Sequence, residues 1–246
     1  MKKVKFRHEN NIENLKNKIK KGDYRNKTIF NFLNQNDLYH LRKNPDFRES
    51  ILLKNSTNFI DGFIISAALS IKKMKKIRRM TGPVFTREIL GEPEISRNSK
   101  HFFIGLGTKE ANEISKVYGI STSKMDFYNP TFIHGNKFPE KEIKKMTDKI
   151  NSFDPDFLWV GVGSPKQNIL VKDLFKRINV KKILKINVGA ALNFAIGKEK
   201  PAPKIVRIIG IEWFYRLVKD FRKTRIKAWR SLVAIRYAFT SIDLDK

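Results

Sequence analysis

The sequence of 246 residues predicts an α/β fold. Short apolar runs alternate with amphipathic stretches along residues 28–200, as in chains whose parallel strands are joined by right-handed helical crossovers. Glycines follow several of the apolar runs, where turns from strand to helix are expected. Together these observations predict a Rossmann-like, mostly parallel sheet flanked by helices, with a basic helical appendage at the carboxyl end.

The elements follow from hydrophobic period and from capping residues. Strands are predicted over residues 28–34, 58–60, 101–104, 125–128, 157–162 and 182–188. Helices are predicted over residues 36–43, from 45 onward, and over 63–71, 109–118, 140–152 and 164–177. In the last of these, Ser164 is expected to cap the helix and Pro165 to occupy its first turn.

Three regions are expected along the chain. Residues 1–27 form a basic extension, in which Ile12, Leu15 and Ile19 have the spacing of a short helix. Residues 28–200 form the α/β core. Residues 201–246 form a basic amphipathic appendage, which follows two prolines and contains one or two helices between about 210 and 238. From residue 213 to residue 240 this segment has eight Lys or Arg side chains and one acid.

Composition limits the possible functions. Lys and Arg number 51 and Asp and Glu 24, so the net charge of +27 indicates an anionic partner: nucleic acid, an anionic membrane face or a phosphorylated substrate. The absence of cysteine excludes a disulfide scaffold, a thiol nucleophile, a Cys-type zinc site and an iron–sulfur cluster. The sequence has no apolar run of the roughly 18 residues that a membrane span needs, so we expect a cytoplasmic protein, soluble or peripheral to a membrane.

One motif lies where a predicted strand meets a helix. Here Gly161 and Gly163 would let backbone N–H groups approach an anion, and Ser164, Lys166 and Gln167 stand at the helix start. Lys166 is suited to contact phosphate, and Gln167 to a base or sugar edge. A tight turn without a ligand explains the glycines equally well, because the motif is neither a Walker A loop nor a full GxGxxG fingerprint.

Weaker candidates lie elsewhere. Gly105 and Gly107 form a second strand–turn pair, which a plain turn also explains. Asp61 follows an apolar strand, where a carboxylate is able to accept a proton from an attacking hydroxyl, although Asp61-Gly62 is also a common turn. The basic run over 72–79 is either a solvated surface or an anion site. The four histidines are scattered, so we expect no metal site.

The carboxy-terminal segment interleaves apolar and basic side chains at helical spacing. A basic amphipathic helix of this kind is suited to lie on an anionic membrane. Packing of its apolar face on the α/β core explains the pattern equally well. Sequence alone leaves both interpretations open.

Taken together, the motifs resemble those of the WecG/TagA/CpsF glycosyltransferases (glycosyltransferase family 26). The resemblance covers about residue 28 to about residue 238. In the carboxy-terminal half it consists of Gly161-Val-Gly-Ser-Pro-Lys-Gln167, Val188-Gly-Ala-Ala191, Gly197, Ala202-Pro203, Gly210-Ile-Glu-Trp-Phe-Tyr-Arg216, Arg222 and Arg225. In the amino-terminal half it consists of Asn34, Asn44-Pro45, Asp61-Gly62, Gly82, Gly105 and Gly107.

The resemblance implies an inverting transferase that moves a sugar, an N-acetylmannosamine type or another hexose, from a UDP-sugar to a polyprenyl-diphosphate-linked sugar. Such products enter teichoic acid, enterobacterial common antigen or capsular polysaccharide of the cell surface. The resemblance also implies a peripheral enzyme on the cytoplasmic membrane face, with no metal or other cofactor. Family members self-associate, which makes a homo-oligomer an expectation.

The resemblance also assigns roles to residues. Asp61 matches the catalytic base, and Asn34 matches a polar residue of the same pocket. Gly163, Lys166 and Gln167 match the nucleotide-sugar loop, and Gly189 lies in a second family motif. Three arginines fall in the appendage that closes over the diphosphate and docks on the membrane: Arg216, Arg222 and Arg225.

Four positions depart from the family pattern. Asn168 replaces the usual Glu, Val84 an Asp, Pro201 an Arg and Phe32 a Thr. These changes suggest altered donor choice, altered acceptor choice or weakened activity. Two other functions therefore stay open: a non-catalytic relative that binds UDP-sugar, and a nucleic-acid-binding protein. Against the second, the sequence shows no RNP, KH or helix-turn-helix signature.

Overall fold

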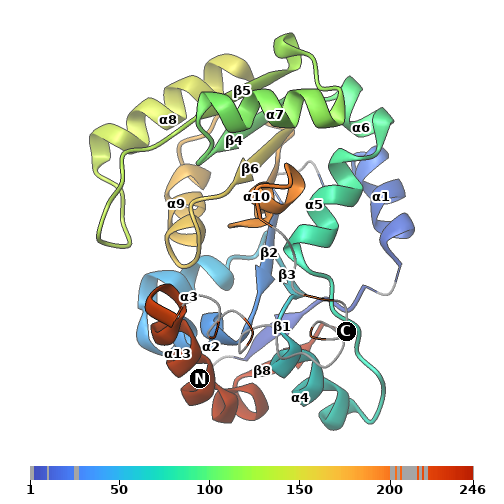
Figure 1. Ribbon diagram of the computed structural model, residues 1–246, viewed down its shortest axis with the longest axis vertical. Coiled ribbons are helices and arrows are strands. Elements are labelled where there is room, and N and C mark those ends of the chain that lie inside the picture. The colour runs from blue at the N-terminus through green and yellow to red at the C-terminus, as the bar shows by residue number, and fades with distance from the viewer. Residues whose placement is uncertain are drawn as a thin grey trace.

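The computed structural model describes residues 3–9, 11–24, 28–199 and 221–245, together with 203, 206, 215 and 218. Six strands form one sheet in the order β3-β2-β7-β6-β4-β5, and every neighbouring pair is parallel. The strands are β2 (Ile29–Leu33), β3 (Ser56–Ile60), β4 (His101–Ile104), β5 (Met125–Tyr128), β6 (Phe157–Val160) and β7 (Leu184–Asn187). The predicted α/β fold with a Rossmann-like parallel sheet is confirmed (Figure 1).

Helices cover both faces of this sheet. On one face, apolar side chains of α1 (Ile12–Lys20), α5 (Gly82–Leu90), α6 (Pro93–Asn98), α7 (Thr108–Tyr118) and α10 (Ala191–Ala195) share a core with the strands. On the other face, α8 (Glu140–Phe153) and α9 (Lys166–Phe175) do the same. The short 3₁₀ turn η1 (Thr122–Lys124) precedes β5.

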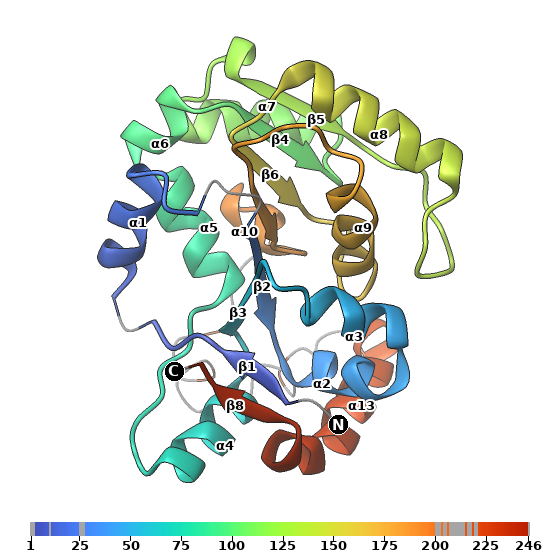
Figure 2. The same ribbon diagram turned by 180° about the vertical axis from the view of Figure 1, so that it is seen from behind.

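A further group of helices lies at one end of the molecule (Figures 1 and 2). It consists of α2 (Gln35–Lys43), α3 (Pro45–Ile51), α4 (Phe63–Lys73) and α13 (Phe221–Thr240). α13 packs against both α2 and α4, which places part of the predicted carboxy-terminal helix on the core. None of the helices within the described ranges is long and apolar enough to cross a bilayer.

The strand period explains the core. Because alternate side chains of a strand point to opposite faces, Phe30, Phe103 and Trp159 lie in the aromatic core beneath α5, whereas Ile104 and Val160 lie beneath α8 and α9. The buried indole of Trp159 donates its N–H to His101 Nδ1 at 3.1 Å, so its polar group is satisfied. The four inner strands, β2, β7, β6 and β4, are buried along their whole length, as expected of a sheet covered on both faces, whereas the edge strands β3 and β5 are partly exposed.

The structure contains elements that the sequence did not predict. β1 (Val4–Phe6) and β8 (Ile242–Leu244) form a second, two-stranded parallel sheet between the two ends of the chain. Three-residue strands are too short to show a period, so only the folded chain reveals them. α5 and α6 were also missed, although each has a proline in its first turn, where proline is common in helices.

Candidate active site

The carboxyl ends of the parallel strands bring the predicted site residues to one edge of the sheet. Asp61 follows β3, Asn34 follows β2, Gly189 closely follows β7, Gly161 follows β6 and Gly105 follows β4. In open α/β sheets, ligands bind outside this edge, where the direction of the chain connections reverses. The topology therefore places these residues at the carboxyl edge of the same sheet, and their roles stay predictions.

Three glycines lie in close contact along this edge. A methyl group on Gly161 would be 3.3 Å from the carbonyl oxygen of Gly189 and 3.4 Å from that of Ile104. On Gly105, where φ is +95°, it would be 3.1 Å from the carbonyl carbon of Gly161. The backbone turns at β4, β6 and β7 therefore pack together with no room for side chains between them.

Asp61 and Asn34 lie side by side. The last residues of β2 and β3, Leu33 and Ile60, are paired, so the two polar residues follow at the same level. The backbone N–H groups of Asp61 and Gly62 both donate to the Leu33 carbonyl, at 3.0 and 3.1 Å. A methyl group on Gly62 would lie only 2.8 Å from Asn34 Cα, so this contact requires glycine.

The carboxylate of Asp61 points to the amino end of α5. Its Oδ1 accepts the backbone N–H of Gly82 at 3.2 Å, and Gly82 is the first residue of that helix. The helix dipole stabilises negative charge at this position and fixes the orientation of the carboxylate. Asp61 is half-buried and so retains access to solvent on one side.

Asn34 also caps the amino end of α2. Its side chain accepts the N–H of Asn36 at 2.9 Å, while Asp37 Oδ2 accepts the N–H of Asn34 at 2.8 Å, which together form a capping box at the start of α2. Only the remaining hydrogen-bonding capacity of this amide is free for a ligand.

Asp37 makes a contact between distant segments that the sequence did not predict. It is buried, and its Oδ1 accepts a hydrogen bond from Ser164 Oγ, which joins the start of α2 to the loop before α9. The predicted capping role of Ser164 is wrong: α9 begins at Lys166, with Pro165 at the N-cap and no side-chain cap. The spacing of Asn34 and Asp37 was the available signal for this helix start.

Gln167 is the best candidate for direct contact with a ligand. Its side chain is 5% exposed, and its Oε1 has no hydrogen-bond partner among the described residues. This oxygen lies 3.5 Å from where a methyl group on Gly189 would stand. Gly163, with φ of +83°, has open space where a side chain would be. An unpaired buried carbonyl is costly, so this oxygen is suited to accept a hydrogen bond from a bound molecule.

Lys166 points to the loop that follows β5. Its Nζ donates to the carbonyl oxygen of Ile133 and lies 4.9 Å from the ring centroid of Phe132, a side chain that is 77% exposed. The ammonium group of Lys166 thus lies at the carboxyl side of the sheet, where it donates its hydrogen bond to a carbonyl oxygen of the protein itself.

Gly107 forms the N-cap of α7, where a methyl group would lie 2.9 Å from Glu110 Oε2. Glu110 in turn forms an ion pair with Lys198 at 2.6 Å, and the hydrogen bond from that lysine lowers the pKa of the carboxyl. The carboxylate of Glu110 therefore lies next to the amino end of α7.

Of the three predicted arginines, the structure places one side chain. Arg225 lies exposed on α13. Arg216 and the side chain of Arg222 lie outside the described residues.

A buried amide network supports the site from below. Asn31 of β2 pairs in register with Asn58 of β3 and Asn187 of β7, and these three side chains lie on one face of the sheet. Asn31 Oδ1 accepts from Asn187 Nδ2 at 2.8 Å and from Asn168 Nδ2 at 2.9 Å, while Asn31 Nδ2 donates to Asn58 Oδ1 at 3.0 Å. The network joins β3, β2 and β7 to the first turn of α9.

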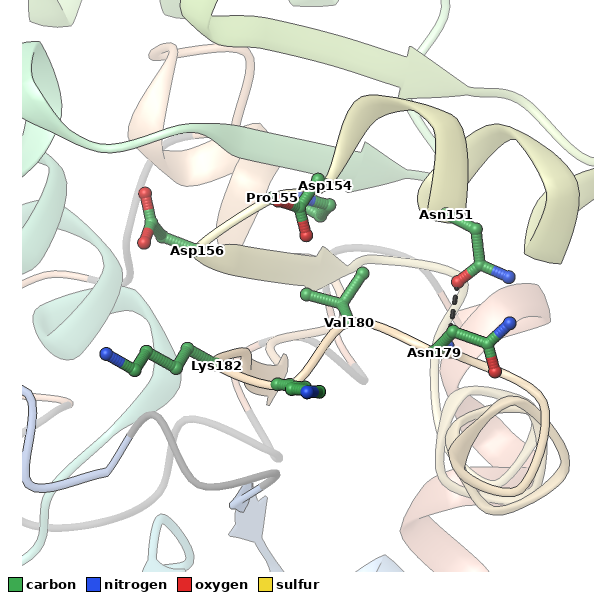
Figure 3. A pocket seen from close by; sticks show the side chains of 8 residues that line it. Asn151, Asp154, Pro155, Asp156, Asn179, Val180 and Lys182 are labelled. Carbon is green, nitrogen blue, oxygen red and sulfur yellow. Dashed lines mark hydrogen bonds between the residues drawn. The ribbon is translucent and has the colours of Figure 1, made fainter.

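A cavity lies at the opposite edge of the sheet. It has a volume of about 520 Å³ and is formed by the end of α8 and the loops that precede β6 and β7 (Figure 3). Its lining residues are Asn151, Asp154, Pro155, Asp156, Asn179, Val180, Lys181 and Lys182. Because it adjoins the amino ends of the strands, it is separate from the predicted site. Within the described part of the chain, no three His, Asp or Glu side chains are grouped to hold a metal ion.

Comparison with known proteins shows to which family the chain belongs. The profile of the "Glycosyl transferase WecG/TagA/CpsF family" matches residues 4–241. The chain belongs to this glycosyltransferase family. Among similar proteins is the N-acetylglucosaminyldiphosphoundecaprenol N-acetyl-beta-D-mannosaminyltransferase of Staphylococcus aureus strain MRSA252, 27% identical over 206 residues, which are 80% of this chain and 78% of that protein. The proteins of the same name from strains MW2 and NCTC 8325 are each 26% identical with the same coverage.

The structure places three of the four residues that depart from the family pattern. Asn168 is buried and hydrogen-bonded to Asn31. Phe32 stacks on Phe59 in the aromatic core, with 5.3 Å between the ring centroids. Both departures therefore change the buried interior of this glycosyltransferase. Val84 is partly exposed in the first turn of α5, two residues from the Gly82 N–H that Asp61 accepts. Pro201 lies outside the described residues.

Proposed function

We propose that this glycosyltransferase transfers an N-acetylmannosamine-type sugar from a UDP-sugar to N-acetylglucosamine linked through diphosphate to a polyprenol. The activity named for the Staphylococcus aureus relatives supports both the sugar and the acceptor. The reaction inverts the anomeric centre, needs no bound metal, and serves the synthesis of teichoic acid or a related cell-wall polysaccharide.

The position of Asp61 carries the proposal. Direct displacement at the anomeric carbon needs a base for the incoming hydroxyl and positive charge near the departing diphosphate. Asp61 supplies the base: it stands at the carboxyl edge, held by the Gly82 N–H, where β3 pairs with the strand that leads to Asn34. The hydroxyl oxygen of the acceptor forms the new glycosidic bond, its proton passes to the Asp61 carboxylate, and the UDP leaves with the bonding electron pair.

The glycine-lined part of the same edge is suited to the UDP group. The turn at Gly163, which is partly exposed and has open space beside it, and the start of α9 offer backbone N–H groups to phosphate. Gln167 Oε1 accepts a hydroxyl or N–H of the donor, since no described residue occupies it. Lys166 exchanges the Ile133 carbonyl for a phosphate oxygen when the donor binds. Arg216, Arg222 and Arg225 supply positive charge to the diphosphate in this proposal.

The lipid acceptor requires that the enzyme meet a membrane. α13 exposes Phe221, Trp229 and Leu232, and Arg225 lies on the same helix. A helix with exposed apolar and cationic side chains is suited to the boundary of an anionic bilayer. We therefore assign the enzyme to the cytoplasmic membrane face as a peripheral protein, and we propose self-association, which sedimentation velocity tests directly.

The test is a UDP-release assay with a panel of UDP-sugars and a short-chain, lipid-linked N-acetylglucosamine acceptor. We expect turnover with UDP-N-acetylmannosamine, and a fall in kcat of about 10² to 10⁴ in Asp61→Asn, because loss of a general base has effects of that size. The amide keeps an acceptor for the Gly82 N–H, so UDP affinity should change little. Asp148→Asn, an exposed acid on α8, is the matched control.

Two results separate the alternatives. Unchanged turnover in Asp61→Asn would remove Asp61 as the base while leaving the transferase activity intact. UDP binding without turnover for any donor in the panel would identify a non-catalytic relative.

A further inference from the structure

The end of α4 presents an unusual surface. Residues 71–76 are exposed without interruption, and among them Ile71 is 68% exposed and Met74 94% exposed. Lys75, Lys76 and Arg78 are exposed around them. We call Ile71, Met74, Lys75, Lys76 and Arg78 the α4 tip.

Met74 combines high exposure with an uncommon backbone conformation. It is the C-cap of α4 and has the left-handed conformation, with φ of +50°, which favours glycine or asparagine. The sequence instead has a long apolar side chain at this position. Nothing in the described part of the protein covers it, although water is an unfavourable environment for a fully exposed Met.

The tip is fixed to the body of the protein. Lys72 Nζ donates to the carbonyl oxygen of Ile242 at 2.9 Å, and Lys73 forms an ion pair with Asp243 at 2.8 Å. These two cations are thus engaged by β8. In contrast, Lys75, Lys76 and Arg78 have no acidic partner among the described residues, so their charges face outward.

We propose that the α4 tip is a docking surface for an anionic lipid bilayer, with Met74 and Ile71 entering the headgroup–acyl boundary and the three cations contacting lipid phosphates. The pairing of aliphatic with cationic side chains matches that boundary. A single-stranded nucleic acid would instead require aromatic side chains for base stacking, and the tip has none.

The position of the α4 tip suggests what its contact with the membrane does. α4 begins two residues after Asp61, and its 11 residues span about 16 Å. α4 and α13 lie at the same end of the molecule in both views, with α7 and α8 at the other end (Figures 1 and 2). Docking the tip beside α13 therefore holds the base at a fixed height above the membrane that carries the acceptor. This functional role rests on the proposed function, whereas lipid binding by the tip does not.

The first experiment measures partition onto vesicles of phosphatidylcholine with 40% phosphatidylglycerol. Each cation near an anionic surface contributes about fivefold to binding, so the triple variant Lys75→Gln, Lys76→Gln, Arg78→Gln should bind about 100-fold more weakly. A control with the same charge change at the other end of the molecule, Lys116→Gln, Lys141→Gln, Lys145→Gln, should bind within about threefold of wild type. Equal losses in the two triple variants would overturn the proposal.

The second experiment uses the absence of cysteine from the chain. Met74→Cys and Val117→Cys, the latter an exposed apolar position on α7, are each labelled with the fluorophore NBD. The label at residue 74 should gain intensity and shift to the blue with anionic vesicles, and the label at 117 should not. No change at residue 74 would show that the tip stays in water.

The acceptor assay keeps the two proposals apart. With a water-soluble acceptor, the tip variant should retain wild-type kcat, since none of its residues lies at the strand edge. With a polyprenyl-linked acceptor in anionic vesicles, its kcat/KM should fall in parallel with the lost binding. Vesicle binding through the tip without any transfer would refute the proposed function and leave the docking surface standing.

Discussion

Replacement of Asn31 with leucine tests how the sheet supports the active site. Asn31 is 1% exposed in β2, and its amide makes three hydrogen bonds, to Asn58, Asn168 and Asn187. Through Asn168 it holds the first turn of α9, which also carries Gln167. Leucine has a similar size but no polar group, so the change removes the bonds and leaves the packing volume nearly unaltered.

The magnitude follows from the groups that lose their partner. Asn58 Oδ1, Asn168 Nδ2 and Asn187 Nδ2 each give up a hydrogen bond in the interior, at about 1–3 kcal/mol for each group left unsatisfied. Burial of leucine in place of an amide offsets about 1–2 kcal/mol. We expect a net loss of about 4–5 kcal/mol from a free energy of unfolding that is about 5–15 kcal/mol in a typical domain.

Urea denaturation followed by circular dichroism measures this loss. Asn112→Leu, an exposed position on α7, is the control and should unfold within about 0.5 kcal/mol of wild type. Because α9 loses an anchor, UDP affinity in Asn31→Leu should also fall severalfold, measured well below the urea midpoint. An unfolding free energy within about 0.5 kcal/mol of wild type would refute the network as a support of the site.

Two further predictions concern packing and pH. Gly161→Ala places a methyl group 2.7 Å from Leu192 Cδ1, so we expect about 1–3 kcal/mol of destabilisation by thermal melting, whereas Gly135→Ala, with open space around it, should change little. Burial, aided by Arg230, lowers the pKa of His40 from 6.5 to about 4. Since the unfolded chain takes up this proton below about pH 6.5 and the folded chain does not, stability should fall by about 2 kcal/mol from pH 7 to pH 4. His40→Gln should flatten that slope; an unchanged slope would contradict the assignment.

Local patterns predicted most of the central sheet. The apolar runs over 101–104 and 157–162 became β4 and β6 because a strand buried on both faces needs a continuous apolar sequence. The position of Asp61 at the strand edge followed in the same way, since the turn chemistry after a parallel strand is local. The roles of Lys166, Gln167 and the arginines stay predictions that the proposed assays test.

Other features of the structure cannot be predicted from residues that are close together in the sequence. The hydrogen bond from Ser164 to Asp37 joins residues 127 positions apart, so the capping role expected of Ser164 gave way to a partner that the sequence does not place nearby. The pairing of Asn31 with Asn58 and Asn187 depends on strand order and register. The sheet of β1 and β8 likewise requires both ends of the chain to meet.

By itself the sequence determined the α/β class, the strand ends that carry Asp61, Asn34 and the glycines, and the family motifs. These properties depend on hydrophobic period and on residues close together in the chain. The tertiary structure decided which strand ends are neighbours, where the side chains of Ser164, Lys166 and Gln167 point, and that the charged run after α4 surrounds an exposed Met74. Those outcomes arise from contacts between distant segments, which form only when the whole chain packs.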